Sequence, residues 1–243
     1  MIGVLALQGA FIEHVRALAR LGVATREVRQ RKDLAGIDGL IIPGGESTTI
    51  GKLLDLLGMT EPVRELGRAG LPIWGTCAGL ILRAREVGRP QTILGLLDIG
   101  VRRNAFGAQL DSFEAVLPIP VLGPDPFPAV FIRAPLIDRL GPGVTPLATL
   151  PDGTIVAAEH ANLLATAFHP ELTGDTRLHE YFVGKVGEWA SRKDEHGSAG
   201  LSAATNPLAH WSTTPTTPTR LRWPRHARTP QQIQRDRGAM EPG

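Results

Sequence analysis

The chain has 243 residues, of which 42% are hydrophobic, and its 26 basic and 24 acidic residues give a net charge of +2. This length and composition predict one globular domain of roughly 200 residues with an appendage. No apolar run approaches the ~18 residues that span a bilayer, and no basic region precedes the first apolar run. We therefore expect neither a membrane segment nor a signal peptide. The single cysteine excludes an intrachain disulfide and indicates a reducing, cytoplasmic setting.

The charge is distributed unevenly along the chain. Residues 197–243 contain six arginines, no lysine and two acids, which gives +4 and leaves −2 for residues 1–196. A near-neutral body argues against a nucleic-acid partner. No group of cysteines and histidines has the spacing of zinc ligands, so we expect no metal and no other bound cofactor.

In the first half of the chain, short apolar runs alternate with helical patterns. The predicted strands are Ile2–Leu7, Ala24–Val28, Gly39–Ile42 and Leu71–Trp74. The predicted helices are Phe11–Leu21, Ser47–Leu57 with Ser47 as N-cap, Glu61–Ala69 and Leu80–Glu86. Such alternation is typical of βαβ units. We expect an α/β fold of three layers, a mostly parallel, flavodoxin-like central sheet with helices on both faces.

The second half is richer in turns and ends in a polar tail. The predicted strands are Val101–Arg103, Phe113–Val116, Ala129–Ile132, Thr154–Ala158 and Leu163–Ala167, followed by a helix at about Asp175–Trp189. After Glu195 the sequence is rich in Ser, Thr, Pro and Arg and cannot bury much apolar area, so we expect disorder. The predicted division is a domain at 1–192 and a disordered tail at 193–243.

Cys77 is the candidate nucleophile. It lies in Trp74–Gly79 (WGTCAG), between a predicted strand and a predicted helix, which is the context of a nucleophile elbow with Cys in place of Ser. The helix N-terminus behind Cys77 favours a thiolate, and the N–H of Ala78 is placed to bind an oxyanion. The alternative is a small buried cysteine beside a core strand.

His169 and Glu171 are the candidate base and its orienting group. They lie in Phe168–Glu171 (FHPE), directly after a predicted strand, where α/β sheets present catalytic groups. Histidine can accept the thiol proton and later donate it to ammonia. The alternative is a loop histidine beside a solvated glutamate. His160 is the only rival base, while His14 and His179 lie on predicted helices and are expected at the surface.

The segment Pro43–Thr49 (PGGESTT) follows a strand and precedes a helix. Its glycines let backbone N–H groups approach a ligand, and Gly45 could supply a second oxyanion donor. An ordinary strand-to-helix turn is the alternative. Arg103 and Arg133, at the ends of two predicted strands, could clamp an amino-acid carboxylate, although each is also compatible with a surface position.

Several segments together resemble the class I (triad) glutamine amidotransferases. They are IGVLALQGAFIEH, GLIIPGGESTTI, GTCAGLIL, VRRNAFGAQLDSFEA, VFIRAP and AFHPELTGD, spread over about residues 2–190. GTCAG with HPE is typical of the class. LQGA, PGGEST, RNxFG and FIRAP narrow the resemblance to the glutaminase subunits of the two-component pyridoxal 5'-phosphate synthases. Ala105, where that family often has Ser, and the segment 161–163 depart from its pattern.

The resemblance implies an activity and a partner. Such subunits hydrolyse L-glutamine through a γ-glutamyl thioester and pass ammonia to a separate (β/α)8 synthase subunit in a large hetero-oligomer. They are usually nearly inactive until that partner docks. By resemblance, Cys77, His169 and Glu171 form the triad, and Gln8 lies beside the oxyanion loop. The implied glutamine contacts are Gly45, Glu46, Ser47, Arg103, Ile132 and Arg133.

Two other functions remain open from the sequence. One is a different cysteine hydrolase of the same fold, such as a γ-glutamyl peptidase. The other is a non-catalytic regulatory homologue. The set of glutamine-binding motifs argues against the first, and the intact set of Cys77, His169 and Glu171 argues against the second.

Overall fold

The structure, a computed structural model, describes residues 1–103 and 112–197, without the side chains of 194–197. Within these residues, ten strands form one sheet in the order β2-β1-β3-β4-β12-β11-β9-β6-β5, with β10 paired to β11. The predicted tail beyond residue 197 and Ala105 lie outside the described residues. No helix in the described part of the chain is long and apolar enough to cross a membrane.

The sheet has a parallel part and a mixed part. Strands β2, β1, β3, β4 and β12 are parallel neighbours, whereas β11 runs antiparallel to β12, β10 and β9. The ten strands are β1 (Ile2–Leu5), β2 (Thr25–Val28), β3 (Gly39–Ile42), β4 (Ile73–Thr76), β5 (Ala84–Glu86), β6 (Leu97–Arg102), β9 (Leu136–Leu140), β10 (Thr145–Thr149), β11 (Ile155–His160) and β12 (Leu163–Thr166). A separate antiparallel pair consists of β7 (Ser112–Leu117) and β8 (Phe127–Ile132).

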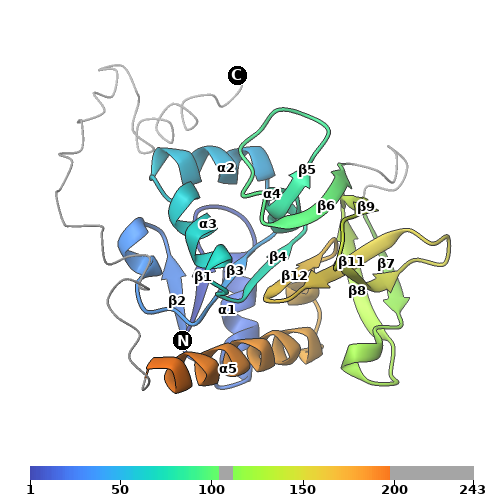
Figure 1. Cartoon of the computed structure of the whole chain (residues 1–243). Helices are drawn as coiled ribbons and strands as arrows, with labels where there is room; N and C mark the ends of the chain where they lie inside the picture. Colours follow the sequence, from blue (N-terminus) through green and yellow to red (C-terminus); the bar gives the residue numbers. More distant parts are fainter. Residues whose placement is uncertain (104–111, 198–243) are drawn as a thin grey trace, which may run out of the picture. The chain divides into compact units, whose positions relative to one another are not determined.

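The helices cover both faces of the sheet. They are α1 (Phe11–Arg20), α2 (Ser47–Leu56), α3 (Thr60–Arg68), α4 (Ala78–Arg83) and α5 (Arg177–Gly197), with 3-10 turns η1 (Arg31–Leu34), η2 (Pro120–Leu122) and η3 (Pro170–Leu172). Figure 1 shows α1 and α5 on one side of the sheet and α2 and α3 on the other. This arrangement confirms the predicted three-layer α/β fold with a mostly parallel sheet.

Adjacent residues of the central strand β4 contact opposite layers, because successive strand side chains point to opposite faces. The fully buried Trp74 ring lies 5.5 Å from the ring of His14 in α1 and 4.9 Å from that of His179 in α5. On the other face, a Cβ added to Gly67 of α3 would lie 3.1 Å from Ile73 Cδ1. Burial of these apolar side chains fixes the helices against the sheet.

Three predictions from the sequence need correction. The N-cap of α2 is Glu46, whose side chain accepts a hydrogen bond from the Thr49 N–H, and not Ser47. The predicted helix Leu80–Glu86 ends at Arg83, and its last three residues form β5. His14 and His179, expected at the surface, are fully buried in the layer between α1, α5 and the sheet.

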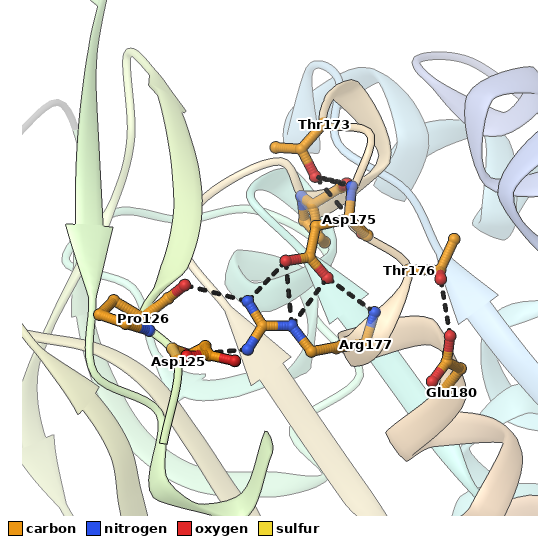
Figure 2. A network of polar contacts seen from close by, with 8 residues as sticks. Asp125, Pro126, Thr173, Asp175, Thr176, Arg177 and Glu180 are labelled. Carbon is orange, nitrogen blue, oxygen red and sulfur yellow. Dashed lines mark hydrogen bonds and ion pairs between the residues drawn. The ribbon is translucent and has the colours of Figure 1, made fainter. Parts of the chain in front are cut away.

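An arginine clamp anchors the segment that follows β12 (Figure 2). Arg177, the first residue of α5, binds the Asp175 carboxylate through Nε and Nη2, at 3.0 and 2.6 Å from Oδ2. The same guanidinium donates to the carbonyl oxygens of Asp125 at 2.6 Å and Pro126 at 2.9 Å. The start of α5 is thereby tied to the turn that leads into β8.

Candidate active site

The candidate functional residues converge at one edge of the sheet. Strands β1, β3, β4 and β12 are parallel, so their carboxyl ends meet at the same edge. The segments that follow them carry Gln8, Gly45, Cys77 and His169 respectively. In open α/β sheets, ligands bind beyond the carboxyl ends of the strands. The fold therefore brings four segments that are far apart in the sequence to one location.

Cys77 occupies a strained turn between β4 and α4. Its φ of 45° and ψ of −100° lie in a region that residues with a side chain rarely adopt. Its backbone N–H donates to the carbonyl of Thr166 at 2.8 Å, which fixes the turn against β12. Only 7% of the residue is exposed, and Sγ lies 3.9 Å from the Ile132 carbonyl oxygen.

His169 is fixed by contacts on three sides. Its Nδ1 lies 2.7 Å from Glu171 Oε1, and its backbone N–H donates to the carbonyl of Val130 in β8 at 2.8 Å. The ring packs against Gly44, where an added Cβ would overlap the imidazole Cε1. Since Nδ1 is engaged with the carboxylate, Nε2 is the ring nitrogen available to the sulfur of Cys77.

The charges of the site favour a protonated imidazole beside an ionised carboxylate. Burial lowers the pKa of His169, but hydrogen bonds and charge interactions with Cys77 and Glu171 outweigh it and raise the pKa to about 10. Burial raises the pKa of Glu171, but the electrostatic interaction with His14 and the hydrogen bond and charge of His169 lower it overall. This arrangement can hold a proton on the imidazole and transfer it to a leaving group.

His160, the rival base, lies far from Cys77. It pairs with Leu163 across β11 and β12, and Leu163 pairs with Ile73 at the beginning of β4. Cys77 directly follows the opposite end of β4, about 13 Å along the strand from Ile73 at ~3.3 Å per residue. His160 is also exposed. The geometry favours His169 over His160 as the base.

Glu46 and Arg103 form a charged pair beside this edge. Arg103 Nη2 lies 3.1 Å from Glu46 Oε1, and Nη1 donates to Gln91 Oε1 at 2.7 Å. Burial raises the pKa of Glu46, but hydrogen bonds from Thr48, Thr49 and Arg103 outweigh it, and the pKa falls to about 2. An ionised Glu46 is suited to an ammonium group and Arg103 to a carboxylate.

The loop after β3 is held by the loop after β1. Gln8 Oε1 accepts the N–H of Glu46 at 2.8 Å, and the Ala10 N–H donates to the Gly44 carbonyl at 3.0 Å. Ala78 is the first residue of α4, so its N–H is among the amides that lack an intrahelical partner. Gly45 and Ala78 thus follow the neighbouring parallel strands β3 and β4, at the same edge of the sheet as Cys77.

The remaining implied contacts have different surroundings. Ser47 is buried and its Oγ donates to Gln91 Oε1 at 3.3 Å. Ile132 approaches Cys77 through its carbonyl, whereas Arg133 is exposed and has a φ of 42°. The described residues contain no group of three or more His, Cys, Asp or Glu side chains able to hold a metal ion.

Three residues near the site were not expected from the sequence. They are His14, His179 and Thr76, whose side chains form a buried hydrogen-bonded set next to Glu171. The sequence did carry a signal that His14 is buried. Counted from Phe11, the residues three, four and seven positions further on are His14, Val15 and Leu18, so His14 lies on the apolar face of the helix. Gln91 also went unpredicted, and no motif marks it.

Comparison with known proteins agrees with this geometry. The model of the SNO glutamine amidotransferase family matches residues 4–188. The chain belongs to the SNO glutamine amidotransferase family. This result confirms the resemblance seen in the sequence motifs.

Curated relatives match this chain over nearly their whole length. A protein of Herpetosiphon aurantiacus, named "Pyridoxal 5'-phosphate synthase subunit PdxT", is 62% identical over 187 residues, covering 75% of this chain and 98% of the relative. Proteins with the same name from Dehalococcoides mccartyi (strain BAV1) and Moorella thermoacetica are 59% and 58% identical, and 95% and 99% of their lengths are covered.

Two solved structures share the fold. One, described as "Crystal structure of glutamine amidotransferase", is 49% identical with a TM-score of 0.73, and the match covers 76% of this chain and 98% of the other. Another, from Thermoplasma acidophilum and described as part of a GMP synthase, is 21% identical with a TM-score of 0.58, covering 79% and 96%; this likeness concerns the fold alone.

Proposed function

We propose that this chain hydrolyses L-glutamine to L-glutamate and ammonia, with Cys77, His169 and Glu171 as its catalytic triad. The observation that carries the proposal is the position of the His169 ring. One of its nitrogens contacts Glu171 Oε1 at 2.7 Å, and the ring also interacts with Cys77 in the strained turn after β4. A nucleophile, a base and an orienting carboxylate in this order form a unit for acyl transfer.

In the proposed mechanism, His169 holds the thiol proton while Cys77 Sγ attacks the side-chain amide carbon of glutamine. The amide oxygen becomes an oxyanion, which the N–H groups of Gly45 and Ala78 would stabilise. When the C–N bond breaks, His169 donates its proton to the nitrogen, ammonia leaves and a γ-glutamyl thioester remains. A water molecule, deprotonated by His169, then attacks the thioester, releasing glutamate and regenerating the thiol.

The substrate would be held by charges at both ends of its amino-acid backbone. The Glu46 carboxylate suits the α-ammonium of glutamine, and the guanidinium groups of Arg103 and Arg133 suit its α-carboxylate. Glu46 and Arg103 already contact each other, so glutamine would bind by entering an existing ion pair. Ser47 and the carbonyl of Ile132 complete the proposed contacts.

We further propose that the ammonia passes to the synthase component of a pyridoxal 5'-phosphate synthase, which is a separate (β/α)8 chain, within a large hetero-oligomer. The support is that relatives 62% and 58% identical to this chain are named subunits of that synthase. The glutaminase domain that we propose for residues 1–192 contains the whole family match, which ends at residue 188. A single thiol suits the reducing cytoplasm as the place of reaction.

The test is an assay of ammonia release from glutamine, with and without the synthase subunit of the same source. We expect slow hydrolysis by the chain alone, strong stimulation by the synthase, and formation of pyridoxal 5'-phosphate in the mixture. Cofactor formation with ammonium salts but not with glutamine would reject the partner. Faster hydrolysis of γ-glutamyl peptides than of glutamine would indicate the peptidase instead, and no hydrolysis of either would indicate a regulatory protein.

A further inference from the structure

The two carboxylate oxygens of Glu171 face two different histidines. Oε1 lies 2.7 Å from His169 Nδ1, as described above. Oε2 has no hydrogen-bond partner among the described residues, and His14 Nε2 lies 3.4 Å from it. Both the His14 and the Glu171 side chains are 0% exposed, so no bulk water can serve the second oxygen. His14 is therefore the polar group placed to stabilise Glu171 Oε2.

His14 is itself held by a chain of buried polar groups. Its Nδ1 lies 3.0 Å from Nε2 of His179 in α5, and its Nε2 lies 3.2 Å from Thr76 Oγ1. Thr76 is the residue before Cys77. The set thus connects the helix α5, the helix α1, the strand that precedes the nucleophile and the carboxylate that orients the base.

The hydrogen-bonding roles within this chain follow from the groups at its ends. A carboxylate only accepts, so the arrangement is favourable when His14 Nε2 carries a proton, which then lies near both Thr76 Oγ1, at 3.2 Å from Nε2, and Glu171 Oε2, at 3.4 Å. His14 Nδ1 is then an acceptor and receives the Nε2–H of His179. His179 Nδ1 becomes a bare lone pair, in agreement with its lack of a partner.

The opposite arrangement is costly. If His14 Nδ1 carried the proton, its Nε2 lone pair could accept from the Thr76 hydroxyl but would still face the negatively charged Glu171. His179 Nε2 would then accept, which would leave an N–H at His179 Nδ1 buried and without an acceptor. His179 Nδ1 is buried without a partner in either arrangement, so the difference lies at the other end of the chain, where a lone pair facing the carboxylate is repelled and an N–H is attracted. A single direction of donation is therefore selected, from His179 through His14 towards Glu171.

Both histidines are neutral in this environment. Burial lowers the pKa of His14 more than the charge of Glu171 raises it. Burial, with the electrostatic interactions of His14 and Arg20, lowers the pKa of His179 to about 2. A neutral donor orients the carboxylate without adding a second full positive charge beside it. The Glu171 charge then remains available to the imidazolium of His169.

We propose that His14 is a positioning residue, a neutral donor to Glu171 Oε2 whose tautomer is set by His179. The proposal rests on the proposed function, in which Glu171 orients His169. We infer that hydrogen-bond donation runs from His179 in α5 through His14 to the Glu171 carboxylate. His14 therefore acts on the reaction only through Glu171. A histidine that merely fills the core beside Trp74 would show no such dependence.

The first test is a double-mutant cycle on glutamine hydrolysis by the synthase-bound chain. We expect His14→Leu to lower kcat by roughly 10- to 100-fold with little change in KM, the range for groups that orient ligating histidines. His14→Gln, which keeps an N–H donor, should restore most of the loss. In a Glu171→Ala background, His14→Leu should have almost no further effect, because the group it acts through is gone. His160→Gln, at the exposed last residue of β11, serves as a control with unchanged activity.

Equal losses from His14→Leu in both backgrounds, with no rescue by His14→Gln, would show a structural role and overturn the proposal. The second test needs neither variants nor activity. Nitrogen-15 NMR of histidine-labelled wild-type chain should show neutral His14 and His179 at pH 7, each protonated at Nε2. A proton at His14 Nδ1, or a charged His14, would overturn the proposal even if glutaminase activity is confirmed. If the enzyme proved inactive on glutamine, the NMR result would still decide the tautomers.

Discussion

The backbone of Gly44 packs so closely against the His169 ring that residue 44 has no room for a side chain. A Cβ at residue 44 would overlap the imidazole Cε1, so the loop after β3 forms part of the wall that positions the proposed base. Gly44→Ala should push the ring away from Cys77 and lower kcat by at least ~100-fold, since small displacements of a catalytic group are costly.

The matched control for this change is Gly184→Ala on α5. An added Cβ there meets nothing within 4 Å. This variant should keep full activity and gain up to about 1 kcal/mol in unfolding free energy from better helix propensity. Full activity of Gly44→Ala in the same assay would show that the ring has another position available.

The strain at Cys77 predicts a conflict between activity and stability. Cys77→Ala and Cys77→Gly should both abolish glutamine hydrolysis, because each removes the only thiol. Glycine accepts a φ of 45° without steric cost, so the Gly variant should be more stable than the Ala variant by about 1–3 kcal/mol. Urea unfolding of both variants measures the difference; equal stability would mean that the turn holds no strain.

The proposed roles of His169 and Glu171 predict unequal losses. His169→Ala removes the proton carrier and should lower kcat by about 10²–10⁴-fold. Glu171→Ala removes only the orienting group and should lower it less. The comparison is made by steady-state kinetics with saturating synthase, and a larger loss from Glu171→Ala than from His169→Ala would reverse the assignment.

The buried histidines predict how stability depends on pH. His14 and His179 are neutral when folded but take up protons near pH 6.5 when unfolded, so their contribution is present above pH 6.5 and lost as pH falls towards the folded pKa, which is about 2 for His179. His169 has the opposite sign: its contribution is present below pH 6.5 and lost as pH rises through about 10.

At pH 5, unfolding should therefore bind about one proton through His179 and a further uptake through His14, whose pKa is also lowered. Each proton bound on unfolding lowers the unfolding free energy by about 1.4 kcal/mol per unit of falling pH. Calorimetry in buffers of different ionisation enthalpy measures this uptake. His179→Gln, which can still donate to His14, should reduce the uptake by about one proton. An unchanged uptake would show that His179 is charged in the folded chain.

The family model ends at residue 188, and the relatives above are covered almost completely by about three quarters of this chain. A chain ending at Gly197, the last residue of α5, should therefore retain synthase-stimulated activity and its melting temperature. A clear fall in melting temperature would assign a stabilising contact to residues 198–243.

The sequence predicted the parallel half of the sheet well because its signals are local. Buried parallel strands such as Gly39–Ile42 are short apolar runs, and these are readable without knowledge of the fold. Strands β9 and β10 were missed: β9 carries the ion-paired Asp138 and Arg139, and β10 carries Pro146. Proline is tolerated in β10 because this strand pairs only with β11.

The motifs in the sequence were enough to locate the candidate site. They did not reveal the buried histidines that lie behind it. Cys77 and His169 each follow an apolar run, and this pattern is visible in the sequence. The contact between His14 and His179 joins residues 165 positions apart, and only the packing of α1 and α5 on one face of the sheet creates it. Their polarity suggested a surface position, whereas their helical faces are apolar.

Cys77, buried at the end of β4, is the only sulfhydryl group of the chain. Oxidation by a peroxide would convert it to a sulfenic acid, and no second cysteine of the same chain could condense with that group to form a protective disulfide. Recovery would then depend on glutathione or another external reductant reaching a side chain that is 7% exposed. Its sensitivity to oxidative stress would follow the occupancy of the site, because a γ-glutamyl thioester has no thiolate to oxidise.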